Sequence, residues 1–202
     1  MENAGGVSGS GLVDGGARVY TFRMRRRSTF ILQFPLYLMV AWALLLVVHG
    51  PTHAQAVAAV FDFELIDTSV EGEINGVRVD EQARLRHLSD QLRQRLTNSG
   101  RFSLVDIAPV AREARASNLQ GCGGCDRQMA KRLGAELAIT GTVQKVSNLI
   151  LNMNIYVRDV SSGATVTAMS ADMRGNTEES WSRALDYLIR NRLLAPDYGV
   201  RR

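Results

Sequence analysis

The chain has 202 residues, of which 46% are hydrophobic and 22% are charged, with a formal net charge of +4. These values fit one globular domain preceded by a targeting segment. Residues 1–56 hold five arginines and two acidic residues, so the remainder carries 19 basic and 18 acidic residues and is nearly neutral. This balance does not support a surface that binds nucleic-acid phosphates, and no nucleic-acid partner is predicted.

Residues 1–56 are predicted to be a leader. Arg25-Arg26-Arg27 precede an apolar run over residues 30–48, and small residues at Ala54 and Ala56 follow it. A basic segment, an apolar segment and a small-residue cleavage site are the layout of a secretory signal peptide. The sequence therefore predicts export to the periplasm, with cleavage after Ala54 or Ala56.

Two further expectations concern the leader. The apolar run is long for a signal peptide, so an uncleaved inner-membrane anchor through residues 30–48 is the alternative, and only then would the protein contact the membrane. Met24 lies directly before the three arginines, and residues 1–23 add nothing to a signal peptide. We therefore expect Met24 to be the initiator and residues 1–23 to be an over-extended start.

The mature domain is predicted over residues 57–195, with a tail over 196–202, and its first strand runs from Ala56 to Leu65. Alternation places Asp62 and Glu64 on one face near the end of that strand. The residues expected on the other face are Val57, Ala59, Phe61, Phe63 and Leu65. The two acids indicate either a solvated strand end or a polar rim of the kind that binds ligands in α/β proteins, with Asp62 as a candidate.

The middle of the chain is predicted to be mainly helical. A polar loop is expected over residues 70–79, followed by a helix from an N-cap at Asp80 to about Thr97. Its buried stripe is predicted to be Leu85, Leu88, Leu92 and Leu96. The next elements are a short strand over 102–107, a helix that begins at Pro109 and ends by 118, and a helix over 127–133 that ends at Gly134.

Residues 135–173 predict three antiparallel strands. The apolar residues Leu151, Met153, Ile155 and Val157 alternate with the polar residues Asn152, Asn154, Tyr156 and Arg158. A period of two indicates a strand with one buried face. The polar face is either solvated or a docking surface, because Tyr and Arg are enriched at binding hot spots and Arg158 could bind a carboxylate of a partner.

A final helix is predicted with Asn176 as its N-cap and Glu179 as the partner in a capping box. Its core face is predicted to be Trp181, Leu185, Leu188 and Ile189. The order of elements is β-α-β-α-β-β-β-α. That order predicts an α/β fold, a two-layer sandwich with a mixed sheet.

Cys122 and Cys125 are the chain's two cysteines and form the one motif with possible chemistry. A zinc site needs about four ligands, and a thioredoxin-type pair needs a strand end before it. In an exported chain two close cysteines favour a structural disulfide, with a redox-active pair, a metal site or another role as alternatives. No cofactor is predicted.

Other enzyme signals are absent from the sequence, which lacks a Gly-x-Ser-x-Gly motif, a Gly-rich phosphate loop and a His-Glu-x-x-His motif. The sequence therefore predicts no enzyme but a periplasmic accessory or binding module that acts through protein contacts, with an unknown envelope protein as its partner. The alternative function is a thiol–disulfide oxidoreductase that uses Cys122 and Cys125.

Three segments carry a family resemblance: residues 56–65, residues 133–151 and residues 174–181. They resemble a family of bacterial secreted proteins of unknown function, with Val143 to Asn148 and Arg174 to Asn176 as the more specific signatures. More distantly, the order of elements is similar to the amino-terminal domain of TolB and to the periplasmic domain of CsgG-like proteins. Those relatives imply an adaptor or assembly module. The lipid-attachment cysteine of CsgG-like proteins has no counterpart here.

Overall fold

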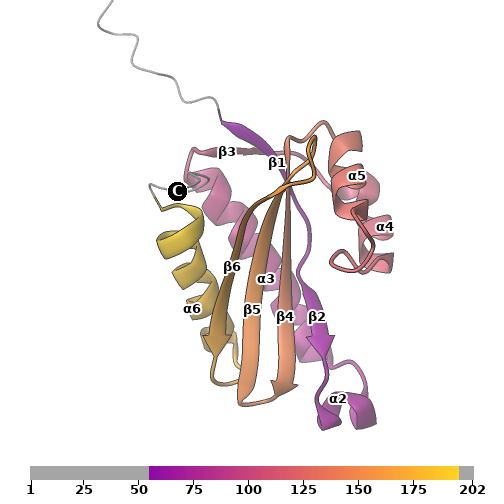
Figure 1. Cartoon of the computed structure of the whole chain (residues 1–202). Helices are drawn as coiled ribbons and strands as arrows, with labels where there is room; N and C mark the ends of the chain where they lie inside the picture. The colour runs from indigo at the N-terminus through magenta and orange to yellow at the C-terminus, as the bar shows by residue number, and fades with distance from the viewer. Residues whose placement is uncertain (1–54, 196–202) are drawn as a thin grey trace, which may run out of the picture. The chain divides into compact units, whose positions relative to one another are not determined.

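The structure is a computed structural model that describes residues 55–195. The predicted leader and the tail over 196–202 lie outside these residues, apart from Gln55 and Ala56. Five α-helices are described: α2 (Val70–Asn75), α3 (Val79–Asn98), α4 (Ala111–Ala116), α5 (Cys125–Arg132) and α6 (Glu178–Leu188). A 3₁₀ turn, η2 (Ala108–Val110), precedes α4, and a π-helical turn, η3 (Ile189–Leu193), continues α6 (Figure 1).

One open mixed sheet of six strands forms the centre of the domain. The strands are β1 (Ala56–Val60), β2 (Glu64–Asp67), β3 (Phe102–Leu104), β4 (Leu137–Ser147), β5 (Ile150–Asp159) and β6 (Thr165–Met173). Their order is β3-β1-β4-β5-β6, with β2 pairing with β4 beyond the end of β1. The pairs made by β1 and β2 are parallel, whereas β4, β5 and β6 are antiparallel. The predicted α/β class with a mixed sheet is confirmed.

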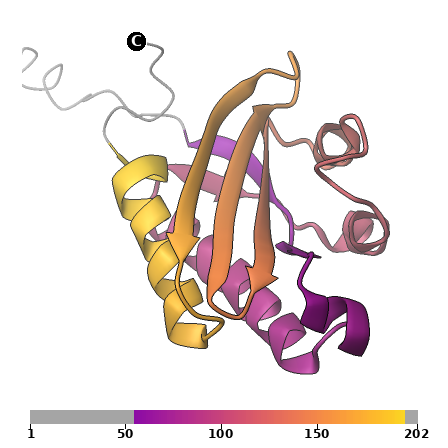
Figure 2. The ribbon, with the colours of Figure 1, turned by 60° about the horizontal axis from the view of Figure 1, so that its bottom comes forward.

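Helices α3 and α6 cover one face of this sheet (Figure 2). The predicted leucine stripe of α3 and the predicted core face of α6 are both buried there, against the apolar residues of β5. Helices α4 and α5 cover the other face only over β1 and the start of β4, where a smaller core forms. The remainder of that second face, on β5 and β6, is free of helices in the described part of the chain (Figures 1 and 2).

The predicted first strand is in fact two strands. Phe61 packs in the smaller core and Phe63 in the larger one, so the expected common face is wrong at this point. The chain breaks at Asp62, and one irregular step reverses the alternation of every residue that follows. Gly141 on β4 accommodates the change, because a Cβ atom there would lie 2.3 Å from the ring of Phe63.

Two further local predictions are wrong. The expected polar loop over 70–79 contains α2, whose N-cap Ser69 accepts a hydrogen bond from the backbone N–H of Gly72. The N-cap of α6 is Thr177, whose hydroxyl accepts from the N–H of Ser180, and not Asn176. Asn176 bonds instead to residues distant in sequence, which no local pattern reveals.

Candidate functional site

A buried lysine organises one end of the sheet. The side chain of Lys145 on β4 is fully buried, and its Nζ lies 2.7 Å from Glu81, 3.2 Å from Asp67 and 3.2 Å from Glu71. Burial works against the ammonium charge, but hydrogen bonds to the three carboxylates outweigh it and raise the pKa of Lys145. We call Lys145, Asp67, Glu71 and Glu81 the lysine cluster.

Two asparagines extend the lysine cluster to neighbouring turns. Asn148, in the turn between β4 and β5, donates to Glu71 at 2.8 Å, and Asn176 donates to Glu81 at 2.6 Å. Asn176 also donates to the side-chain oxygen of Asn148 at 3.0 Å. The two signature segments of the family resemblance therefore meet here, and together they fix α2, α3 and two turns to the sheet.

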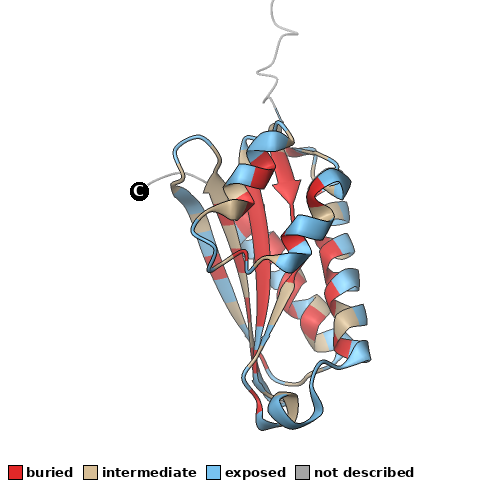
Figure 3. Ribbon diagram, turned by 90° about the vertical axis from the view of Figure 1, so that its right-hand side faces the viewer, coloured by how far each residue is buried: buried red, intermediate tan, exposed pale blue. Residues whose placement is uncertain are grey.

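Exposed apolar side chains gather at the end that the lysine cluster supports. They lie on α2, on the link from α2 to α3, and on the β4–β5 hairpin, and each is between 57% and 83% exposed. We call them the apolar end: Val70, Ile74, Val77, Val79, Val146, Leu149 and Ile150. Figures 1 and 3 show α2 and the hairpin turn at the same end of the sheet, drawn mostly in the pale blue of exposed residues in Figure 3. Side-chain periodicity did not identify this surface, because four of its seven residues lie in the segment 70–79 that was predicted to be a loop.

The predicted polar face of β5 is where alternation placed it, but much of its hydrogen-bonding capacity is used within the protein. Asn152 donates to Ser170 at 2.9 Å and to Asp172 at 2.8 Å, and Asn154 donates to Thr142 at 3.5 Å. Tyr156 is half-buried beneath the guanidinium of Arg158, which lies 5.3 Å from its ring centre. The polar side chains of this face are therefore already hydrogen-bonded to, or packed against, other residues of the domain.

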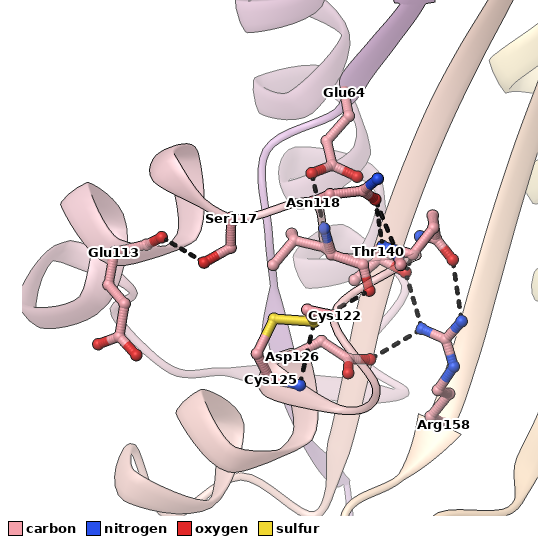
Figure 4. Close-up of a disulfide and its surroundings, with 12 residues drawn as sticks. Glu64, Glu113, Ser117, Asn118, Cys122, Cys125, Asp126, Thr140 and Arg158 are labelled. Atoms are coloured by element: carbon pink, nitrogen blue, oxygen red, sulfur yellow. Dashed lines mark hydrogen bonds and ion pairs between the residues drawn. A yellow bond between two sulfur atoms is a disulfide. The ribbon is translucent and has the colours of Figure 1, made fainter.

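Arg158 does not point to solvent as a free cation. Its guanidinium lies 2.8 Å from Asp126, a carboxylate with 1% of its side chain exposed, and donates to Gln120 at 2.9 Å. Figure 4 shows Arg158 reaching from β5 into the loop that precedes α5. The carboxylate that Arg158 binds is thus the protein's own, and the sequence could not reveal it because the two residues are 32 positions apart.

Cys122 and Cys125 form a disulfide within the same loop (Figure 4). Cys125 is the first residue of α5, but Cys122 lies in a turn after α4 and not at a strand end. The strand-to-helix position of a thioredoxin-type pair is therefore only half fulfilled. Among residues 55–195 no group of His, Cys, Asp or Glu side chains is arranged to hold a metal ion. The oxidoreductase alternative is without support.

Asp62 lies at the end of β1, between two arginines. Arg93 on α3 binds it and also donates to the carbonyl of Val60, and Arg115 on α4 lies 3.3 Å from it. Burial alone would raise the pKa of Asp62, but the hydrogen bonds and charges of Arg93 and Arg115 outweigh it and lower that pKa. Asp62 at the strand end is therefore paired with two arginines of the same domain, and its role in binding a ligand stays a prediction.

The fold and these surfaces define a mixed α/β module with an apolar end. The chain belongs to the DUF3280 family, described as "Protein of unknown function (DUF2380)", whose profile matches residues 56–193. No curated protein matches the chain. The predicted membership of a family of unknown function is confirmed. Within residues 55–195 no helix is both long and apolar enough to cross a bilayer.

Solved structures share the outline of the fold at low identity. The LpoB C-terminal domain from Salmonella enterica is 15% identical, with 65% of this chain and 91% of that chain covered and a TM-score of 0.42. Lipoprotein GNA1162 from Neisseria meningitidis is 13% identical, with 70% and 98% covered and a TM-score of 0.42. The PelC dodecamer from Paraburkholderia phytofirmans is 12% identical, with 70% and 92% covered and a TM-score of 0.41. None of the three is named as a TolB or CsgG-like protein, and at these scores they carry no argument about function.

Proposed function

We propose that this protein is an exported accessory module of the cell envelope that binds another protein through its apolar end. The observation that carries the proposal is the set of seven exposed aliphatic side chains at the apolar end. The lysine cluster fixes the segments that carry them to the sheet. Exposed apolar groups gathered at one place mark interaction surfaces in soluble domains. Burying one aliphatic side chain in an interface contributes about 1.5–3 kcal/mol, so a few of them can determine binding.

The chemistry of the apolar end favours a protein over a lipid surface. Membrane-binding segments combine Lys and Arg with Trp or Phe. Residues 67–80 carry four acidic side chains and one basic side chain, Arg78, and contain no aromatic residue. Anionic lipid would be repelled by this charge balance. The partner is therefore expected to offer aliphatic groups with a neutral or basic rim.

The apolar end is also a better candidate than the polar face of β5. Asn152 and Arg158 on that face already bond to other residues of the domain, so a partner would have to replace contacts that exist. The aliphatic side chains of the apolar end have no such internal partners to lose. Docking through the polar face of β5 stays a prediction. The affinity-capture experiment described below tests it with the variant Tyr156→Ala.

Export is part of the proposal. It is supported by the predicted leader and by the disulfide, because disulfides persist in oxidising compartments. Amino-terminal sequencing of the mature protein should begin near Gln55 or Val57. Intact protein recovered from the cytosol, or an apolar segment retained in the membrane, would contradict export with cleavage.

The test of the binding surface is quantitative recovery of periplasmic proteins by affinity capture and mass spectrometry. The double variant Ile74→Ser, Leu149→Ser should lose the proteins that the wild type recovers, whereas the control Val166→Ser, Tyr187→Ser should keep them. Both control side chains are exposed and lie away from the apolar end, on β6 and α6. Equal recovery by all variants would refute the proposal, and selective loss with Tyr156→Ala would move the surface to β5.

A further inference from the structure

A cleft opens where β1 and β3 end. Helix α3 packs on one face of the sheet and α4 on the other, and residues of both helices line the cleft. The cleft between them has a volume of ≈ 510 Å³, and its lining includes Glu64 and Leu65 of β2, Leu85 of α3, and Ala111 and Ala114 of α4. Volumes of this size are typical of binding sites, and strand carboxyl ends are where open α/β sheets place them.

The floor of the cleft is an unpaired strand edge. Within residues 55–195, β3 pairs only with residues Ala56 to Ala58 of β1, and β2 pairs only with β4. The backbone N–H of Thr68 donates to the carbonyl of Lys145 on β4 at 2.9 Å. Because successive residues of a strand point their backbone groups to opposite sides, Leu65 turns its N–H and C=O away from β4. An edge of this kind is a template for another strand.

Glu64 brings an uncompensated carboxylate to the cleft. It accepts a hydrogen bond from the N–H of Leu119 at 2.9 Å, and no ion pair to it forms among residues 55–195. Burial raises the pKa of Glu64, and the nearby charge of Asp126 raises it further. Asp62, which also lines the cleft, differs because two arginines neutralise it. A cation placed beside Glu64 would therefore supply the counterion that this carboxylate lacks among the described residues.

We propose that this cleft binds an extended segment of a partner protein, which pairs with the free edge of β2 and places a lysine or arginine side chain against Glu64. Strand addition uses the backbone groups of Leu65 for affinity, and the flanking side chains give specificity. The walls contributed by Ala111, Ala114 and Leu85 are small or apolar, so aliphatic residues fit beside the basic one. A free amine would satisfy Glu64 but would leave the strand edge unpaired, and for that reason a peptide is the occupant.

The experiment is the selection of linear heptapeptides from a phage-displayed library on the purified full-length protein. We expect enriched peptides with a lysine or arginine between aliphatic residues. Synthetic copies of these peptides should bind Glu64→Gln at least tenfold more weakly than wild type. Glu113→Gln is the matched control and should bind unchanged, because Glu113 is exposed and pairs with Arg132 outside the cleft.

Two further measurements separate binding in the cleft from a folding defect. Replacing the basic residue of the peptide by norleucine should weaken binding to wild type as much as Glu64→Gln weakens binding of the original peptide. Combining the two changes should lower the affinity little more than either change alone. Ala111→Trp, which narrows the cleft, should also weaken binding. Enriched peptides without a basic residue, unchanged binding to Glu64→Gln, or no enrichment at all would overturn the proposal. The double variant Ile74→Ser, Leu149→Ser should leave peptide binding unchanged. The proposal for the cleft and the proposal for the apolar end are therefore tested independently.

Discussion

Replacing Lys145 with methionine should be among the most destabilising single changes in this domain. The substitution keeps the length and the apolar stem of the side chain and removes the charge. Glu81 would then be a fully buried carboxylate without its cation, and one of its oxygens, Oε2, already lacks a hydrogen-bond partner among residues 55–195. The cost comes from that stranded charge and not from a cavity.

The structure sets the size of this effect. Removing one partner of a buried ion pair costs about 3–5 kcal/mol, whereas Asp67 and Glu71 are partly exposed and lose little when their partner is removed. For a domain of this size the loss corresponds to a Tm that is lower by roughly 10 °C. The double variant Lys145→Met, Glu81→Leu removes both charges and should recover most of the loss.

Urea denaturation followed by circular dichroism measures these differences, with an unchanged m-value as evidence that the folded state is the same. The chain has two lysines, and Lys131 on α5 is exposed, so Lys131→Met is the matched control and should cost less than about 0.5 kcal/mol. A loss below about 1 kcal/mol for Lys145→Met, or no recovery in the double variant, would refute the reasoning.

The pH dependence of stability adds a second check. Burial opposes ionisation of Asp67, but hydrogen bonds from Ser69 and Lys145 outweigh it and lower its pKa below the ordinary 3.8. Its stabilising contribution is therefore present above pH 3.8 and is lost as the pH falls through the lower folded value. The pKa of Lys145 is raised above 10.5, so its contribution is present below that pH and is lost on further alkalinisation. Lys145→Met should remove the alkaline part of this profile.

Two more predictions concern the loop before α5. Replacing Cys122 and Cys125 together by serine should leave the protein folded. The free energy of unfolding measured in urea should fall by about 2 kcal/mol, because the disulfide closes a short loop. An unfolded variant would contradict this prediction. Arg158→Met should lower the free energy of unfolding by about 3 kcal/mol, because it leaves the buried Asp126 without its cation. Arg112→Met, on the exposed side of α4, should be nearly neutral by the same measurement. Equal losses for the two variants would show that the Arg158–Asp126 pair does not stabilise the fold.

Features that repeat within one helix or strand could be predicted from the order of residues alone. The leucines of α3 and the alternation along β5 depend only on the geometry of a helix or strand, so their buried faces could be predicted. Alternation along β4 places Lys145 on the same inward face as Ile139, Gly141 and Val143. A lysine at an inward position indicates a buried charge, although it does not say what the charge meets.

Contacts between segments that are distant in sequence depend on how the helices and strands pack together. Lys145 and Glu81 are 64 residues apart, and Asn148 and Asn176 are 28 apart, so no local period relates them. The break at Asp62 was hidden for a similar reason. Arg93 and Arg115 hold Asp62 from two different helices, and Phe63 can enter the larger core only because Gly141 lies opposite. Local pattern determines which way a side chain points, and the packing of elements against one another determines what it meets.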